Sequence, residues 1–127
     1  MAEELKMLID GEWVSSSAND KIEIINPYDQ SVIALAPRAT LADTRRAIAA
    51  AKRAFYTDGW ADTTQAELAE KLYKFADLME RDVERLATAE TKNTGKAYIE
   101  SEYDVYDSAA CVRYYAGLIS KPTGQTY

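Results

Sequence analysis

The residues that could do chemistry in this sequence are one cysteine and a group of acidic side chains close to it. Cys111 is the single soft nucleophile, and the sequence contains no histidine. A thiol nucleophile needs a neighbouring base, and histidine is the commonest one. Cys111 stands among small residues in a predicted helix, where a cysteine commonly serves as a small buried hydrophobe. We therefore expect Cys111 to be buried and to take no part in catalysis.

Carboxylate pairs near Cys111 offer a second kind of chemistry. Glu100 and Asp104, and Asp104 and Asp107, stand at helical spacing. Such a pair can act as general acid and general base. That role needs burial that shifts a pKa, which a polar helix face does not promise. An acidic, solvated helix face explains these pairs as well.

Metal and nucleotide sites lack their usual signals. One cysteine and no histidine leave neither a Cys/His zinc site nor an internal disulfide. The five glycines lie at positions 11, 59, 95, 117 and 124, so they form neither a GxGxxG turn nor a phosphate-binding loop. From the residues alone we predict no catalytic and no cofactor-binding residue in this chain.

The charge of the chain argues against nucleic acid as a partner. The net charge is −6, and the excess of acids lies in the helical stretch between Asp62 and Asp107. A stretch of this charge repels phosphates. No run approaches the roughly 20 apolar residues of a membrane span, and the N-terminus does not resemble a signal peptide. We expect a cytoplasmic protein that contacts no membrane.

The elements that must position these residues begin with a β-region over residues 1–37. The Asp10-Gly11 pair within residues 7–14 predicts a hairpin with a type I′ turn, because this dipeptide readily takes positive φ angles. Two β-branched runs, residues 22–25 and 31–36, flank a turn that contains a proline. The sequence predicts four short strands that are incompletely paired within one chain.

Helical spacing replaces this alternation from Thr40 onward. Thr40-x-x-Asp43 and Thr64-x-x-Glu67 are capping signals. The predicted helices cover residues 40–57, 64–94 with a break near Asp82, and 98–121 with Lys121-Pro122 as the stop. The fold class is therefore α+β in this chain, with β-hairpins followed by three main helices, and the pattern predicts a single domain.

Each predicted helix carries an apolar stripe that we expect to be buried. The stripes are Leu41, Thr44, Ile48, Ala51 and Phe55; then Leu68, Leu72, Phe75, Met79, Val83 and Leu86; then Ile99, Tyr103, Tyr106, Ala110, Tyr114 and Gly117. Tyrosine is concentrated in the last helix and beyond. Tyrosines combine a large apolar area with a hydroxyl, so their density suits a core, an interface or a pocket wall.

Six local patterns occur together in one order along the chain. They are Leu8-Ile-Asp-Gly-Glu-Trp13; Ile25-Asn-Pro27; Ala47-Ile-Ala-Ala-Ala-Lys-Arg-Ala-Phe55 with Trp60; Ala76-Asp-Leu-Met-Glu-Arg-Asp82; Glu90-Thr91 with Thr94-Gly-Lys96; and Arg113-Tyr-Tyr-Ala-Gly117. Together they span essentially the whole chain. The set resembles the N-terminal portion of the NAD(P)-dependent aldehyde dehydrogenases, and is similar to their betaine-aldehyde members.

The resemblance implies a much longer parent enzyme with a Rossmann-like α/β coenzyme domain, of which residues 1–127 would be the N-terminal part. Such enzymes oxidise an aldehyde, betaine aldehyde or a similar small one, to a carboxylic acid with NAD or NADP. Their catalytic cysteine, glutamate base and coenzyme-binding residues lie beyond the matched region. The resemblance thus implies a fragment that is inactive alone, whose partners are the rest of the parent enzyme or copies of itself in a homo-oligomer.

The resemblance also implies two sites within this chain. A monovalent cation, Na⁺ or K⁺, would be held by main-chain oxygens of Ile24 and Ile25 and by an acidic side chain at position 93. Asn93 is neutral, so we expect this cation to bind weakly or not at all. The last helix borders the aldehyde tunnel in the family, which places Tyr106 and Asp107 near the substrate.

One alternative of another class stays open, a stand-alone helical protein-interaction module. Its tyrosine-rich helix and acidic face would bind a partner. Exposed apolar area separates the two hypotheses, because a fragment leaves a large bare patch whereas an evolved module presents a smaller, rimmed one.

Overall fold

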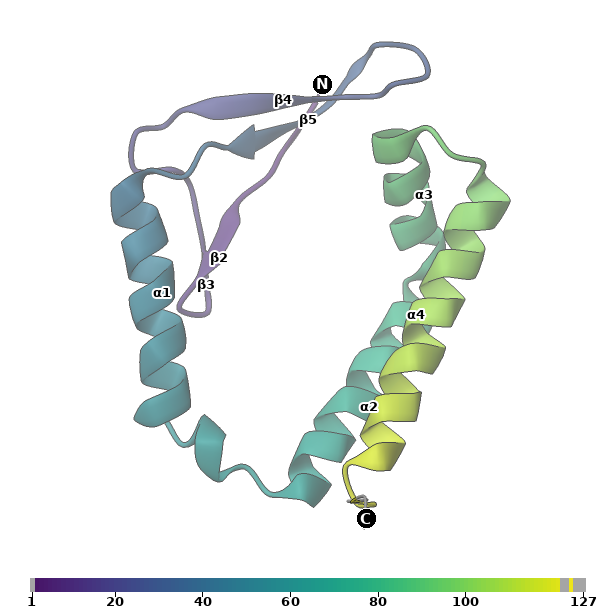
Figure 1. Ribbon diagram of the computed structural model, residues 1–127. Coiled ribbons are helices and arrows are strands. Elements are labelled where there is room, and N and C mark those ends of the chain that lie inside the picture. The colour runs from purple at the N-terminus through teal and green to yellow at the C-terminus, as the bar shows by residue number, and fades with distance from the viewer. Residues whose placement is uncertain (1, 122–123, 125–127) are drawn as a thin grey trace. The chain divides into compact units, whose positions relative to one another are not determined.

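The computed structural model describes residues 2–121 and 124 of the 127-residue chain. The chain folds into short strands followed by helices, so the predicted α+β class is confirmed (Figure 1). Its contacts divide it into two compact units, one ending at Asp62 and the other beginning at Thr63. The sequence predicts one domain, and the only signal at this boundary is a helix cap.

The first unit holds the strands, in two separate sheets. The strands are β1 (Glu3–Glu4), β2 (Met7–Ile9), β3 (Glu12–Val14), β4 (Lys21–Ile25) and β5 (Val32–Pro37). One sheet has the order β1-β5-β4 and the other is the β2-β3 hairpin. Four of these strands match the prediction, and β1 was missed. It consists of two glutamates without an apolar pattern, and it is a strand because it pairs in parallel with β5.

The β2-β3 hairpin has the predicted turn. Asp10 and Gly11 take φ angles of 59° and 78°, which are the positive values that a type I′ turn requires. The register places Leu8 opposite Trp13 and Ile9 opposite Glu12. Because side chains alternate between the two faces of a strand, Ile9 is buried whereas Leu8 and Trp13 are exposed.

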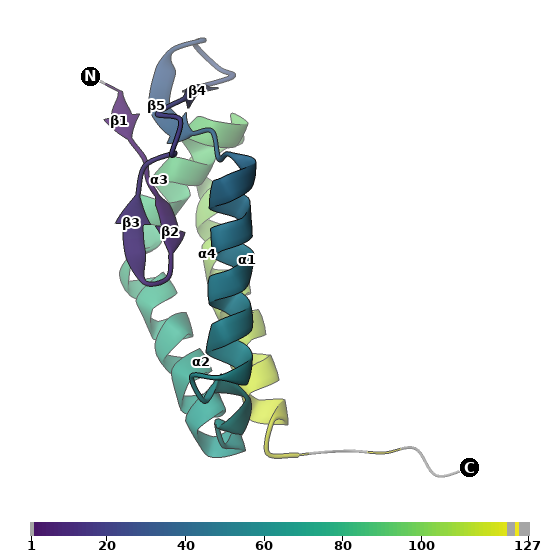
Figure 2. The ribbon, with the colours of Figure 1, turned by 90° about the vertical axis from the view of Figure 1, so that its left-hand side faces the viewer.

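Helix α1 (Leu41–Tyr56) completes the first unit with the short 3₁₀ helix η1 (Trp60–Asp62), and both views show the hairpin beside α1 (Figure 2). Its predicted buried stripe is wrong, because Leu41, Ile48 and Phe55 are all exposed. The least exposed positions of α1 are Asp43, Ala47 and Ala50. Small side chains on this face allow other segments to approach the helix closely, and apolar periodicity alone does not reveal that preference.

The second unit consists of helices α2 (Gln65–Arg81), α3 (Val83–Thr94) and α4 (Tyr98–Leu118). The break falls at Asp82 as the sequence predicts, and Gly95 ends α3 with φ 78°. Helix α4 packs along both α2 and α3 (Figure 1). The predicted stop at Pro122 lies outside the described residues.

Small residues form the core of the second unit. Ala76, Ala87, Ala109 and Ala116 are fully or almost fully buried, and Ser101 is 0% exposed. Such residues let helix axes approach closely. The predicted stripe of α4 is therefore wrong. Its large members Ile99, Tyr103, Tyr106 and Tyr114 face outward and are exposed, as is Ala110.

Two further expectations concern burial and membranes. Cys111 is exposed, which contradicts its expected burial, because the helix turns the neighbouring Ala109 inward instead. In the second predicted stripe Phe75 is exposed, while Leu68, Leu72 and Met79 are half-buried.

Within the described part of the chain, no helix is long and apolar enough to span a bilayer.

Candidate functional site

An open groove on the second unit is the candidate site. Its volume is about 470 Å³. Residues of all three helices line it, namely Met79, Leu86, Glu90, Ser101, Asp104, Val105, Asp107 and Ser108. Met79, Leu86 and Val105 make part of the wall apolar, whereas the other lining residues are acidic or carry hydroxyls.

The turn between α3 and α4 brings one cation to the acidic end of this groove. Gly95 ends α3 in a left-handed conformation, and Lys96 follows it directly. The ammonium group of Lys96 contacts the Asp104 carboxylate and lies 3.4 Å from Glu90 Oε1. The hydrogen bond from Lys96 to Asp104, with a further contribution from Glu90, raises the pKa of Lys96. Lys96 therefore stays protonated and offsets part of the negative charge.

A hydroxyl pair connects α4 to α3 at Ser101, one of the lining residues. Ser101 Oγ lies 2.8 Å from Thr91 Oγ1, which joins α4 to α3. Ser101 has no exposed area, so this hydrogen bond satisfies a group that burial would otherwise penalise. Thr91 belongs to the Glu90-Thr91 pattern of the sequence, whereas Ser101 was not predicted, because a serine ten positions from a threonine carries no periodic signal.

An arginine joins α4 to α2 further along the helix. Arg113 Nη2 donates to Asp77 Oδ1 at 2.7 Å and to Glu80 Oε2 at 2.9 Å, and Arg113 Nη1 also contacts Glu80. These hydrogen bonds lower the pKa of the Glu80 carboxyl. Arg113 belongs to the Arg-Tyr-Tyr-Ala-Gly pattern, and its geometry gives that pattern a structural role in holding α4 in place.

The predicted tunnel residues occupy different surroundings. Asp107 lines the groove. Tyr106 is not among the lining residues and is exposed on the outer face of α4. The groove takes the α4 positions 101, 104, 105, 107 and 108, which share one side of the helix, and position 106 lies on the other side. The structure thus brings Asp107 together with Glu90 and Asp104, and leaves Tyr106 apart from them.

The residues of the predicted cation site belong to different units. Ile24 is half-buried and Ile25 is exposed in β4. The register of β4 against β5 shifts between these two residues, so the regular ladder is interrupted there. Asn93 is an exposed residue of the last turn of α3. The cation site stays a prediction.

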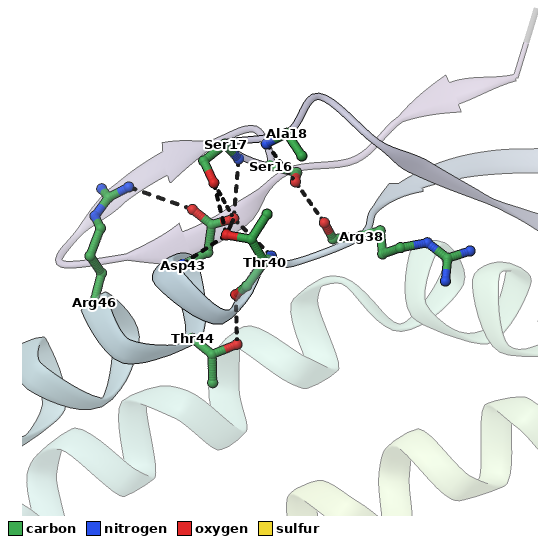
Figure 3. Close-up of polar contacts among 8 residues, drawn as sticks. All are labelled: Ser16, Ser17, Ala18, Arg38, Thr40, Asp43, Thr44 and Arg46. Atoms are coloured by element: carbon green, nitrogen blue, oxygen red, sulfur yellow. Dashed lines mark hydrogen bonds and ion pairs between the residues drawn. The ribbon is translucent and has the colours of Figure 1, made fainter.

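Asp43, at the start of α1, is a carboxylate that accepts four hydrogen bonds (Figure 3). Its Oδ2 atom accepts hydrogen bonds from the main-chain nitrogens of Thr40 at 3.0 Å and Ser17 at 3.1 Å. The hydroxyls of Thr40 and Ser17 donate to the same oxygen at 2.8 and 3.1 Å. The main-chain donors, first Thr40 and then Ser17, lower the pKa of Asp43 to about 2.

The surroundings of Asp43 give it a structural role. The residue is 1% exposed, and its Oδ1 atom makes no hydrogen bond within the described residues. The nearest charge is Arg46 Nη1, at 3.8 Å from Oδ1. Ser16 Oγ reinforces the same junction by donating to the main-chain oxygen of Arg38 at 2.6 Å. The capping box is as predicted, whereas the contribution of the loop at Ser16 and Ser17 was missed.

Two observations limit the chemistry that the described residues can perform. Within residues 2–121 and 124, no group of three or more His, Cys, Asp or Glu side chains is placed to hold a metal ion. Cys111 is not among the residues that line the groove. The arrangement can bind and orient a molecule through carboxylates and hydroxyls.

Comparison with a family model gives a match over almost the whole chain. The aldehyde dehydrogenase family model matches residues 13–127. Betaine aldehyde dehydrogenase of Bacillus subtilis is 40% identical over 119 residues, which is 94% of this chain and 24% of that protein. An aldehyde dehydrogenase of Emericella nidulans is 38% identical over 122 residues, or 96% of this chain and 24% of that protein.

Solved structures show the same fold. An NAD-dependent aldehyde dehydrogenase from Sinorhizobium meliloti superposes with a TM-score of 0.92 at 30% identity, covering 100% of this chain and 26% of that one. The NAD⁺ complex of a Bacillus cereus aldehyde dehydrogenase superposes with a TM-score of 0.90 at 40% identity, covering 98% of this chain and 26% of that one. The chain spans about a quarter of the length of the relatives it matches.

Proposed function

The chain belongs to the aldehyde dehydrogenase family, and we propose that it supplies the N-terminal part of an enzyme that oxidises an aldehyde to a carboxylic acid with NAD. The observation that carries this proposal is the superposition of the whole chain on such enzymes at 30 to 40% identity.

Within that enzyme, we expect this chain to form part of the wall of the substrate site and to support neighbouring segments. NAD, when bound, accepts the hydride that the aldehyde loses. The scattered glycines of this chain form no phosphate-binding loop, so the residues that hold NAD come from the remainder of the enzyme. Helix α4 is held against α2 by Arg113 and against α3 by Ser101, which makes it a firm wall for a neighbouring site.

The groove supports a small, positively charged aldehyde as substrate. Glu90, Asp104 and Asp107 line the groove, and Lys96 contacts the first two of these carboxylates. An excess of carboxylates attracts cations and repels anions. Betaine aldehyde carries a quaternary ammonium group, and the relative from Bacillus subtilis is named for that substrate. Asp107 is the residue of this groove that we place beside the substrate.

The outer face of α4 supports a covering partner. Ile99, Tyr103 and Tyr114 are 53%, 62% and 64% exposed. A contiguous apolar face of this kind marks a surface that another segment covers. In the proposed enzyme this segment is the remainder of the parent chain or another copy in a homo-oligomer. A smaller covering partner, as in a stand-alone interaction module, is the rival explanation of the same face.

We propose that the cation site has a low affinity for Na⁺ and K⁺. Asn93 offers one neutral oxygen in place of a carboxylate, so it does not offset the cost of dehydrating a bound ion. We expect equal melting temperatures in Na⁺, K⁺ and a bulky organic cation. A shift specific to one ion that is lost in Asn93→Ala would contradict the proposal.

A chimera tests the proposed function. Residues 13–121 would replace the matching segment of the Bacillus cereus enzyme, and NADH formation would be followed with betaine aldehyde and with an uncharged aldehyde of similar size. We expect activity with NAD and a preference for the charged aldehyde, and we expect Asp107→Asn to raise the KM for the charged aldehyde only. Glu100→Gln, a carboxylate of α4 outside the groove, is the matched control.

The two parts of the proposal fail in different ways. A chimera that folds and binds NAD but oxidises no aldehyde would refute the proposed function. Activity without any preference for the charged aldehyde would refute only the substrate class.

A further inference from the structure

The two Asp-Gly dipeptides of the sequence are Asp10-Gly11 and Asp58-Gly59. Both glycines have positive φ angles, 78° and 84°. In an Asp-Gly pair, the glycine nitrogen can attack the carboxyl carbon of the aspartate. A C–N bond forms while the carboxyl C–O bond and the amide N–H bond break, so that water leaves and a cyclic succinimide remains. Water then adds to the main-chain carbonyl carbon of the ring, the bond from that carbon to the glycine nitrogen breaks, and the chain afterwards runs through the aspartate side chain.

The surroundings of both glycines favour that reaction. A side chain on the residue after aspartate hinders the attack, and every other aspartate of the sequence is followed by a residue that has one. Apart from the two chain neighbours, a Cβ atom placed on Gly11 or Gly59 would meet no atom within 4 Å, so no distant segment packs against either glycine there. Among the described residues, neither glycine nitrogen donates a hydrogen bond. The Asp10 and Asp58 side chains are 54% and 49% exposed, so water reaches them.

One guanidinium binds both carboxylates. Arg53, near the end of α1, contacts Asp10 Oδ1 through Nη2, and its Nε donates to Asp58 Oδ2 at 3.2 Å. Asp10 is 43 positions away in the sequence, whereas Asp58 is five positions away. Hydrogen bonds with Asp10 first, and then with Asp58, raise the pKa of Arg53. A carboxylate held by this cation is less free to rotate toward the nitrogen of the next residue.

We infer that Asp10 and Asp58 are the two sites at which this chain isomerises spontaneously to isoaspartate, and that Arg53 restrains the reaction at both. The inference is independent of the proposed enzyme activity. Isomerisation at Asp10 inserts a methylene group into the main chain of the turn between β2 and β3. The register that places Ile9 in the core then no longer fits the turn.

The test is ageing of the 127-residue chain at neutral pH and raised temperature. Peptides are separated by chromatography, because isoaspartate leaves the mass unchanged, and isoaspartate is counted with a specific methyltransferase. In Arg53→Ala we expect isoaspartate at both positions to rise about two- to fivefold over the wild type, the range that losing an exposed ion pair allows. Arg45→Ala, which removes the same charge from the same helix, should match the wild type.

Folding is checked by circular dichroism before ageing. If Arg53→Ala unfolds, Arg53→Lys replaces it, and the rise is then expected at one position or both because a single amine cannot reproduce the guanidinium fork. Equal isoaspartate in the folded variant and the wild type at both positions would overturn the restraint. Isoaspartate that accumulates first at another aspartate would overturn the assignment of the sites.

Discussion

Single residues of this chain acquire their roles from partners that are distant in sequence. Thr40 and Asp43 could be predicted as a capping box because three residues separate them. The loop contribution to the same carboxylate could not, because Ser17 lies 26 positions away. Asp107 could be placed near a substrate only through the resemblance to a family, since a carboxylate on a helix carries no local sign of the groove beside it. Periodicity likewise could not reveal that Cys111 is exposed.

Acid should lower the stability of the first unit, because it protonates the Asp43 carboxylate. Its pKa is 3.8 when unperturbed and about 2 in the folded chain. The folded state therefore holds the proton more weakly than the unfolded state does, and the stabilisation is complete above pH 3.8 and is lost as the pH falls toward 2. We expect Asp43→Asn to lower stability at neutral pH and to flatten this acid dependence.

Acid titration followed by circular dichroism, with urea present, measures this effect. Asp62→Asn is the control, because Asp62 is an exposed aspartate of the short helix η1 in the same unit. An unchanged acid transition in Asp43→Asn would contradict the assigned role. Asp82 also has a pKa of about 2, owing first to its hydrogen bond with Arg81, so part of the acid transition should remain in the variant.

Two glycines should respond oppositely to alanine. Gly95 has φ 78° at the end of α3, where a Cβ atom is strained, so Gly95→Ala should cost about 1 kcal/mol. Gly117 lies within α4, and a Cβ there would meet Tyr73 Oη at 3.4 Å, an ordinary contact. Gly117→Ala should therefore be neutral or stabilise by up to about 1 kcal/mol, because alanine favours helix. Urea denaturation of both variants measures the difference, and equal effects would refute it.

Elements were predicted more reliably than the faces they bury. Caps, the type I′ turn and the break at Asp82 all depend on neighbouring residues, so local sequence reveals them. The buried face of α4 depends on which side chains permit close approach of α2 and α3. Apolar spacing favoured the tyrosine side, whereas the packing uses Ala109 and Ser101. When a helix carries apolar residues on several sides, their periodicity does not indicate which side is buried.

Adjacent alanines of α4 should therefore differ sharply. Ala109 is 0% exposed against the other helices, and Ala110 is exposed. Ala109→Leu adds atoms where no space exists, so it should destabilise the chain by about 1–3 kcal/mol. Ala110→Leu should change stability by less than about 0.5 kcal/mol. Urea denaturation compares the two. Should Ala110→Leu prove the more damaging, the inner and outer faces of α4 would have to be exchanged.

At the scale of the whole molecule, resemblance predicted the family correctly, whereas apolar periodicity predicted the buried helix faces incorrectly. The order of six patterns survives in the sequence whatever surrounds the chain. Burial depends on neighbours, and this chain spans about a quarter of the length of its relatives. Exposed residues such as Ile48, Phe55 and Tyr103 have the apolar character of a covered surface. Sequence therefore predicts which positions are apolar without specifying what covers them.

Catalysis should be absent from the 127-residue chain alone. Cys111, its single thiol, is not among the residues that line the groove, and the sequence contains no histidine to act as base. We expect no aldehyde-dependent NADH or NADPH formation, and no difference between the wild type and Cys111→Ala. Spectrophotometric assay of a sample of verified mass checks this. Turnover that disappears in Cys111→Ala would contradict it.

The exposed thiol of Cys111 also makes the chain readily labelled. It is the single cysteine, and it stands three residues before Tyr114 on α4. A maleimide fluorophore or a nitroxide attached there would occupy one defined position without any prior mutagenesis. Its emission or its spectral line width would report when the tyrosine-rich side of α4 loses contact with water. Position 111 thus offers a single attachment point for a spectroscopic probe on α4.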